Sequence, residues 1–368
     1  MTKRFCKNVD ITDLDFIVFC INDWIKHKTE KELNYRKNKK LLNSFKSIHD
    51  LAIFMQNELR RHSLTLGKLT IKNVIDRSNG KHRTYAIEEP LRQLYGYIAY
   101  FALDELKHKI GPHQYHSDGR GPLDAVKCAQ KWMNTNNVEY AVKMDLRHCY
   151  QSIHRNYVMA WMNKHVANKD LLWLIDTLIS TLPNKSLGIG SRFAIRICGL
   201  YLSDLYHEIE NLSSFRSMRY FYKHMFYLDD IFIFGKKSDK LVKIVKLIKI
   251  ITARYGLTIK DSWAIIDLRH SNKNACIDVL GYKVYRDHIT MRRRNYVKTK
   301  KSLKKFKGDR SIKNANSFIS YYGGNIKHTD SVRFCEKYNA KHYYKKARKV
   351  VSNYARSRVQ RKTTGSTC

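Results

Sequence analysis

Two adjacent aspartates, Asp229 and Asp230, stand between two apolar runs, residues 224–227 and 231–235. Both runs are rich in aromatic and β-branched residues, which predicts the two strands of a hairpin. Two neighbouring carboxylates at the tip of an apolar hairpin repel each other and lose solvation, so the arrangement is costly unless a cation lies between them. A divalent metal ion is such a cation.

A third carboxylate, Asp145, lies within an upstream segment in which apolar and polar residues alternate, residues 142–146. This alternation predicts a strand. Three carboxylates on neighbouring strands can hold two magnesium ions, and the peptide carbonyl of Leu146 is a further oxygen ligand of the kind that magnesium prefers. The alternative is that all three are solvated carboxylates in exposed turns.

Composition points to a polyanionic partner. The 368 residues include 70 Lys and Arg against 32 Asp and Glu, a formal charge of +38, with 43% hydrophobic residues for a core. Such a surplus favours nucleic acid. No apolar run approaches a membrane span, and residues 16–21 are too short for a signal peptide core, so we expect a cytoplasmic protein without a membrane partner.

The acidic segments resemble motifs of the reverse transcriptases. The sequence Tyr227-Leu228-Asp229-Asp230 is similar to their Tyr-x-Asp-Asp hairpin, and the segment ending in Asp145 is similar to their first catalytic strand. Residues 186–191, 255–260 and 279–284 then follow in the family's order. Residues 118–126, 291–295 and 320–328 resemble bacterial enzymes of the defence-associated and diversity-generating-retroelement groups.

The resemblance implies an α+β fold, the right-hand polymerase with fingers, palm and helical thumb, whose antiparallel palm sheet is backed by helices. We assign residues 1–50 to an N-terminal helical extension and 51–137 to the fingers. We assign residues 138–290 to the palm, with residues 155–185 partly in the fingers. Residues 291–368 form the basic helical thumb and C-terminal tail, since ten Lys or Arg fall between Arg292 and Arg310.

The implied activity is RNA-directed DNA polymerisation, an enzymatic nucleotidyl transfer. Asp145, Asp229 and Asp230 would be catalytic and would hold two Mg²⁺ ions with Leu146, and Asp230 would lie nearer the primer end. Two ions roughly 3.5–4 Å apart activate a 3′-hydroxyl and help pyrophosphate to leave.

Further residues would bind the deoxynucleotide. Lys81 and Arg83 match a fingers position that holds the triphosphate, and the alternative is that they are simple surface charges. Tyr150 would pack beneath the sugar and exclude a 2′-hydroxyl, or it is a core aromatic. Gly190 matches the template-facing loop, and Lys260 would protonate pyrophosphate.

Two segments depart from the pattern. Relatives usually carry Leu-Pro-Ile-Gly-Asn where this chain has residues 187–191, which puts fidelity and template contacts in doubt. Lys260 is displaced from the family's lysine, which puts its role in doubt.

Nucleic-acid contacts are expected in the last third of the chain. Gly281 and Tyr282 resemble the primer grip, and a tight turn in a palm strand would look the same. The basic residues expected to grip a duplex are Arg292, Arg293, Arg294, Lys298, Lys300 and Lys301.

The expected partners are an RNA template, in particular a structured noncoding RNA, the cDNA product and deoxynucleotides, with an accessory protein or a homo-oligomer as further options. Anti-phage defence is the first biological setting. Mutagenic copying in a diversity-generating retroelement and a stand-alone intron or retron enzyme are alternatives. A catalytically inactive RNA-binding scaffold is the alternative class, and the three intact aspartates argue against it.

Overall fold

The computed structural model describes residues 3–75, 82–116, 119–215, 218–272 and 274–364. The chain divides into two compact units. The first combines Met1–Arg120, Lys143–Ile233 and Asp239–Ala264, and the second combines Gly121–Val142, Phe234–Ser238 and Ile265–Cys368. These units are defined by the contacts within the chain, and their boundaries differ from those expected for fingers, palm and thumb. The division into fingers, palm and thumb therefore stays a prediction.

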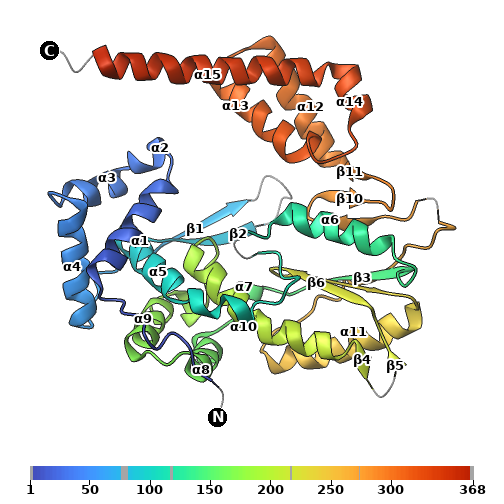
Figure 1. Ribbon diagram of the computed structural model, residues 1–368, viewed down its shortest axis with the longest axis horizontal. Helices are drawn as coiled ribbons and strands as arrows, with labels where there is room; N and C mark the ends of the chain where they lie inside the picture. The colour runs from blue at the N-terminus through green and yellow to red at the C-terminus, as the bar shows by residue number, and fades with distance from the viewer. Residues whose placement is uncertain (1–2, 76–81, 117–118, 216–217, 273, 365–368) are drawn as a thin grey trace. The chain divides into compact units, whose positions relative to one another are not determined.

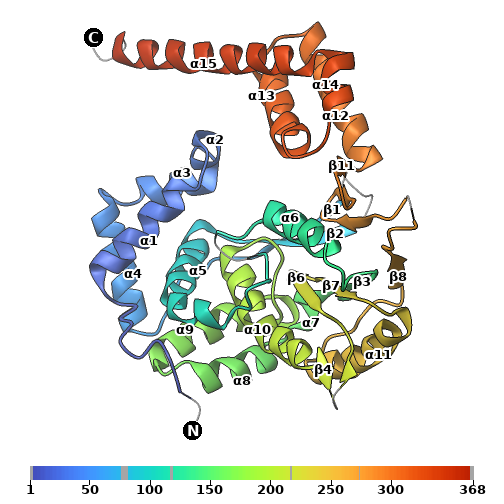
Figure 2. The same ribbon diagram turned by 45° about the vertical axis from the view of Figure 1, so that its right-hand side comes forward.

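The N-terminal helices are α1 (Leu14–Lys26), α2 (Glu30–Leu33), α3 (Arg36–Asn43) and α4 (Ile48–Arg60). Asp13 caps α1 by accepting from the N–H of Phe16, and Ser47 caps α4 by accepting from the N–H of Asp50. The buried face of α1 packs on α4 and on α5 (Pro90–Ala102), as the blue and cyan helices of Figure 2 show. Helices α1, α2, α3 and the start of α4 lie within residues 1–50, and the assignment of these residues to an N-terminal extension stays a prediction.

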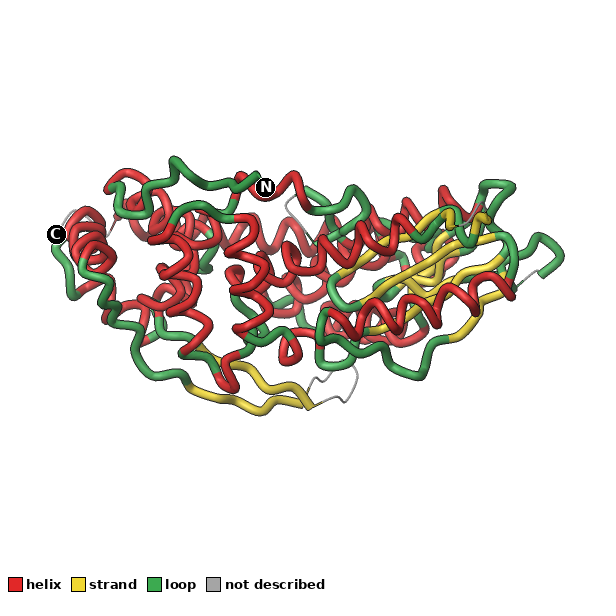
Figure 3. Tube along the Cα trace, turned by 90° about the horizontal axis from the view of Figure 1, so that it is seen from below, coloured by secondary structure: helices red, strands yellow, loops and turns green. Residues whose placement is uncertain are grey.

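A two-stranded antiparallel ribbon, β1 (Thr70–Ile75) and β2 (His82–Ile87), precedes α5. Pro90 occupies the first turn of α5, where a missing N–H costs nothing, and the predicted apolar face of this helix is buried. The 3₁₀ helix η1 (Asp104–Lys109) follows. Figure 3 shows this ribbon in yellow, apart from the larger group of strands elsewhere in the chain.

A four-stranded sheet has the strand order β6-β7-β3-β8. Figure 1 labels β3 and β6 of this sheet, and Figure 2 labels all four strands. Its strands are β3 (Tyr140–Asp145), β6 (Lys223–Tyr227), β7 (Asp230–Gly235) and β8 (Ala264–Asp267). The accompanying helices are α7 (Cys149–Ser152), α8 (Arg155–His165), α9 (Lys169–Ser180), η2 (Pro183–Lys185), α10 (Arg192–Asn211) and α11 (Ser238–Arg254), and β4 (Ser214–Phe215) pairs with β5 (Met218–Arg219). The ring of Tyr206 on α10 lies 5.4 Å from that of Phe226 on β6, so α10 backs the sheet. The predicted α+β class is confirmed.

The second unit contains α6 (Pro122–Met133) and an antiparallel sheet of β9 (Ile277–Val279), β10 (Tyr282–Val284) and β11 (Ile289–Met291). Its C-terminal helices are α12 (Arg293–Gly308), α13 (Ile312–Tyr321), the π-helix η3 (Tyr322–Ile326), α14 (Val332–Tyr338) and α15 (Ala340–Thr364). Leu303, Phe306 and Phe318 are buried at the centre of this helical group.

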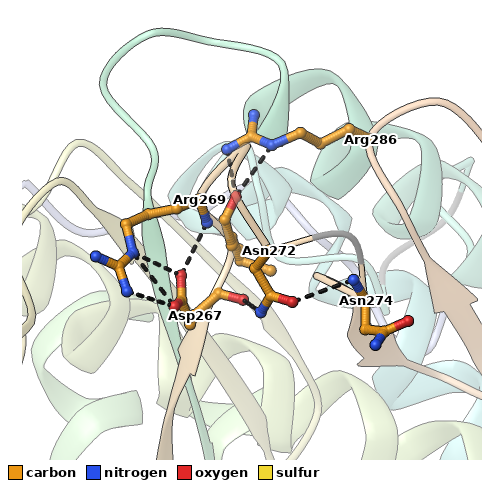
Figure 4. Close-up of polar contacts among 6 residues, drawn as sticks. Asp267, Arg269, Asn272, Asn274 and Arg286 are labelled. Carbon is orange, nitrogen blue, oxygen red and sulfur yellow. Dashed lines mark hydrogen bonds and ion pairs between the residues drawn. The ribbon is translucent and has the colours of Figure 1, made fainter.

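A polar network closes the connection after β8 (Figure 4). The carboxylate of Asp267 accepts from the backbone N–H of Arg269 at 2.9 Å and from its guanidinium at 2.8 Å. Asn272 donates to the carbonyl of Asp267, and Arg286 donates to the carbonyl of Leu268 at 2.6 Å. The network therefore ties the segment after β8 to the end of the β9–β10 hairpin within the second unit.

Across the described ranges, no helix combines the length and the apolar character needed to cross a bilayer.

Candidate active site

The predicted acidic hairpin is present. Strands β6 and β7 are joined by a two-residue turn, Leu228 and Asp229, and Asp230 is the first residue of β7. Leu228 has a φ of +52°, in the left-handed region that tight hairpin turns require. Because residues 231–234 are fully buried, they anchor the hairpin and fix the place of the two carboxylates at its tip.

The end of β3 is held against this turn by backbone hydrogen bonds. The N–H of Leu146 donates to the carbonyl of Asp229 at 2.9 Å. On the other side, the N–H of Lys260 donates to the carbonyl of Asp145 at 2.9 Å, and Leu146 forms an antiparallel bridge with Ile259. The N–H and C=O of one strand residue point to the same neighbour, so the carbonyl of Leu146 faces the hairpin.

Two lysines contact the carboxylates. The Lys143 ammonium lies 3.4 Å from Oδ1 of Asp230 and 5.2 Å from the ring centroid of Phe232. The Lys260 ammonium donates to the carboxylate of Asp145. Lys143 was not among the predicted site residues, although its position two residues before Asp145 puts both side chains on one face of β3.

The pKa of Asp230 reflects both its burial and the two neighbouring carboxylates. Burial raises the pKa of Asp230 to about 6, the nearby Lys143 lowers it, and the carboxylates of Asp229 and Asp145 raise it again. Both unfavourable effects act on the charged form of Asp230. A bound cation would relieve them.

The three aspartates are of the right chemical type to bind a divalent cation, but their side chains are not gathered around one position. Within the described part of the chain, no group of three His, Cys, Asp or Glu side chains is gathered closely enough to hold a metal. Asp145 and Asp230 instead contact Lys260 and Lys143. Carboxylates are the hard oxygen donors that Mg²⁺ binds, and their mutual repulsion favours it. The two-ion arrangement stays a prediction.

Tyr150 lies on α7 beside the hairpin. Its pKa is raised, chiefly by burial and then by the neighbouring thiols of Cys198 and Cys149 and the carboxylate of Asp229, and its side chain bonds the Cys198 thiol. The two sulfur atoms are 4.0 Å apart. The phenol is therefore close to Asp229, as a sugar-packing residue must be, and this role also stays a prediction. No local pattern could have indicated the cysteine pair, because the pairing joins α7 to a distant helix.

The glycine loop contacts the two-stranded ribbon. Gly190 has a φ of +115° and lines a cavity of about 430 Å³ together with Tyr85, Lys72 and Arg192. A Cβ at position 190 would lie 3.8 Å from Tyr85, an ordinary contact, so the backbone conformation and not space calls for glycine. Lys72 faces this cavity and was not among the predicted triphosphate ligands.

Two of the predicted nucleotide ligands are described little or not at all. Lys81 lies outside the described residues. For Arg83 the structure describes the backbone alone, which lies in β2 opposite Val74.

The expected primer-grip segment is a tight hairpin. Leu280 and Gly281 both have positive φ, +50° and +99°, and connect β9 to β10. Tyr282 is 8% exposed and its hydroxyl donates to the carbonyl of Gly324. Its side chain is buried within the second unit, so a contact with nucleic acid would be made by the turn residues Leu280 and Gly281.

The predicted basic residues of the thumb fall into three environments. The Arg292 guanidinium donates to Asp278 at 2.6 Å through Nε, and Lys298 is half-buried. Lys300 lies 5.4 Å from the ring centroid of Tyr338, and Lys301 lines a hollow with Lys304 and Lys305. The exposed members are Arg293, Arg294, Lys300 and Lys301. Arg293, Arg294 and Lys301 are available for phosphate, whereas Arg292 pairs with Asp278 and Lys300 contacts Tyr338.

Comparison with known proteins identifies the class. Residues 75–284, more than half of the chain, match the reverse transcriptase (RNA-dependent DNA polymerase) family. The chain belongs to this family, whose members are nucleotidyltransferases, and the predicted family and polymerase class are confirmed. No curated protein sequence matches the chain.

The solved structures that are similar to this chain include two telomerases. One is telomerase from Candida albicans in complex with the TWJ fragment of telomeric RNA, at 11% identity and a TM-score of 0.47, covering 80% of this chain and 62% of that one. The other is apo telomerase from Candida tropicalis truncated from its C-terminal domain, at 12% identity and a TM-score of 0.42, covering 61% of this chain and 55% of that one. The chain thus spans less than two thirds of either structure.

Proposed function

We propose that this protein extends a DNA primer on an RNA template, with Asp145, Asp229 and Asp230 as its catalytic carboxylates. The observation that carries the proposal is the 2.9 Å hydrogen bond from Leu146 to the Asp229 carbonyl. It joins the strand that ends in Asp145 to the turn that carries the other two aspartates. Membership of the reverse transcriptase family supports the same activity.

The cofactor we propose is Mg²⁺, as two ions held by Asp145, Asp229, Asp230 and the Leu146 carbonyl. When bound, such ions activate the primer 3′-hydroxyl and neutralise the leaving pyrophosphate. Lys260, whose ammonium contacts Asp145, is the side chain that we assign to protonate the pyrophosphate. Lys143 keeps Asp230 ionised by opposing the rise in its pKa.

Substrate selection is assigned to α7 and the glycine loop. The half-buried Tyr150 ring, close to Asp229, would exclude a 2′-hydroxyl from the sugar position. Lys81 and Arg83 remain the proposed triphosphate ligands, and Lys72 joins them because it lines the same cavity as Gly190. The left-handed backbone at Gly190 would face the templating base.

The biological setting that we propose is anti-phage defence by a cytoplasmic, bacterial enzyme that copies a dedicated, structured noncoding RNA into cDNA. A charge of +38 over 368 residues supports a large RNA partner. Mutagenic copying in a diversity-generating retroelement is the alternative setting. A catalytically inactive RNA-binding scaffold would have no use for three half-buried aspartates, of which Asp145 and Asp229 repel Asp230.

The proposal is tested by primer extension on an RNA template with Mg²⁺. Asp145→Asn and Asp229→Asn keep the side-chain shape and remove the charge, so each should lower the rate at least about a hundredfold, or about 2.7 kcal/mol. Asp261→Asn is the matched control, because that carboxylate pairs with Lys249 and its side chain is 80% exposed. If the Asp145 and Asp229 variants retain the control's activity, the catalytic assignment is wrong.

A further inference from the structure

The C-terminal helix α15 carries one continuous basic face. Six of its residues line a hollow of about 360 Å³ and recur at i, i+3, i+4, i+7, i+8 and i+11: Lys345, Arg348, Lys349, Ser352, Asn353 and Arg356. This spacing places them on one side of a helix, and all six are exposed. We call this set the α15 stripe. Over residues 340–364 the sequence has no Asp or Glu.

The opposite face of α15 is built into the second unit. Ala347 is fully buried, and Tyr344 stacks on Tyr322 of η3 with ring centroids 4.0 Å apart. Tyr343, Val350 and Val351 pack against the same core. Figure 2 shows α15, in red, running along α13 and α14, with which it is in contact. The packing therefore fixes the outward direction of the α15 stripe.

The α15 stripe keeps its positive charges uncompensated. Like charges three and four residues apart repel each other and destabilise a helix. In the described ranges, none of the four basic residues of the stripe forms an ion pair with an acid, whereas Arg292 pairs with Asp278 and Lys249 with Asp261. The repulsion extends over several turns of α15, and a bound polyanion would neutralise it.

The geometry favours a nucleic-acid backbone over a lipid surface. A helix that lies on a membrane needs an exposed apolar face, and the apolar face of α15 is used inside the protein. The stripe extends about 17 Å at 1.5 Å per residue, long enough to follow several phosphates of one strand. Ser352 and Asn353 add the neutral donors that often bind phosphate oxygens.

We propose that the α15 stripe binds the sugar–phosphate backbone of RNA, as a contact surface separate from the basic residues expected on α12. This inference rests on the proposed function, because an enzyme that copies RNA must bind an RNA molecule. The contact is with the backbone, so it carries no base specificity.

The test measures binding of a short RNA hairpin by fluorescence anisotropy over a range of salt concentrations. The stripe variant combines Lys345→Gln, Arg348→Gln, Lys349→Gln and Arg356→Gln, since glutamine is a good helix former. The control variant combines four exposed lysines from other surfaces and has the same net charge: Lys236→Gln, Lys237→Gln, Lys243→Gln and Lys246→Gln.

The stripe variant should bind at least about tenfold more weakly, and its salt dependence should flatten by roughly 0.7–0.9 for each phosphate that it no longer neutralises. The control variant should stay within about threefold of wild type. Equal weakening in the two variants, with unchanged helix content by circular dichroism, would show that only net charge matters and would overturn the inference. A stripe variant that binds RNA normally and fails to bind phosphatidylserine vesicles would also overturn it.

The inference and the proposed function fail in different ways. If wild-type protein shows no primer extension while RNA binding depends on the α15 stripe, the polymerase proposal fails and the RNA surface stands. If extension on a short primer–template is intact and the stripe variant binds RNA as the control does, the inference fails alone.

Discussion

The backbone N–H of Leu146 donates to the carbonyl oxygen of Asp229 over 2.9 Å. This single bond couples the residue that follows Asp145 to the turn that carries the other two aspartates. The coupling runs through the main chain, so it survives replacement of any of the three carboxylates. Loss of activity in an aspartate variant can therefore be separated from loss of the site's framework by a melting experiment.

Gly190→Ala should weaken both folding and template use. A residue with a side chain is strained at a φ of +115°, by about 1–3 kcal/mol, although the Cβ itself has room beside Tyr85. We expect the free energy of unfolding to fall by that amount and primer extension to slow on RNA templates. Denaturant titration and steady-state kinetics measure the two effects.

Gly188→Ala is the control for that change. Its Cβ would meet Ala86 and Leu182 at ordinary distances of 3.6 and 3.7 Å, and its φ is not positive. It should behave nearly as wild type. If the two variants lose equal stability, crowding in the loop and not backbone conformation sets the requirement at position 190.

Tyr150→Ala should change sugar selectivity. Removing the ring opens space for a 2′-hydroxyl, so the ratio of kcat/KM for ribonucleotides to that for deoxynucleotides should rise at least about tenfold. Tyr150→Phe removes only the hydroxyl that bonds Cys198 and should keep the wild-type ratio. A fixed ratio in Tyr150→Ala, with both efficiencies reduced together, would make Tyr150 a packing residue.

The sequence predicted those parts of the site that depend on local pattern. The acidic hairpin could be predicted because residues 231–234 are all apolar and must be buried on both faces. Helix α5 could be predicted because Pro90 starts it and its apolar residues recur at helical spacing. The strand ending in Asp145 followed from its alternation.

The unpredicted parts depend on contacts between distant segments. Lys260 seemed displaced in the motif order, yet its ammonium contacts Asp145 because residues 258–260 pair with the end of β3. The sequence also left Tyr282 open as a nucleic-acid contact. Its burial follows from a hydrogen bond to Gly324, more than forty residues away. No local pattern encodes such pairings.

Acid should destabilise the fold through His224. This side chain is 4% exposed, packs 4.3 Å from the ring of Tyr206, and has its pKa lowered to about 3, first by burial and then by the charge of His113. The His224 imidazole takes up a proton near pH 6.5 in the unfolded chain, but only near pH 3 in the folded protein, because its pKa is lowered there. Stability from this group is therefore complete above about pH 6.5 and falls by about 1.4 kcal/mol per pH unit as pH drops toward 3.

His224→Phe removes that titration and should lose less stability than wild type between pH 7 and pH 4.5, as urea denaturation would measure. His49→Gln changes an exposed histidine and is the control, with the same pH dependence as wild type. Parallel curves for His224→Phe and wild type would mean that other groups account for the acid sensitivity.

The protein should copurify with one structured RNA from its own host. A charge of +38 exceeds what a short primer–template duplex neutralises, and residues 340–364 of α15 include no acidic residue to offset their positive charges. Sequencing the bound nucleic acid should show one discrete RNA enriched over the cellular pool. The same RNA, supplied with deoxynucleotides and Mg²⁺ to protein stripped of nucleic acid, should be copied more efficiently than an unrelated RNA of equal length. A broad sample of cellular RNA, together with equal copying of the two templates, would contradict a dedicated noncoding RNA while leaving the polymerase assignment intact.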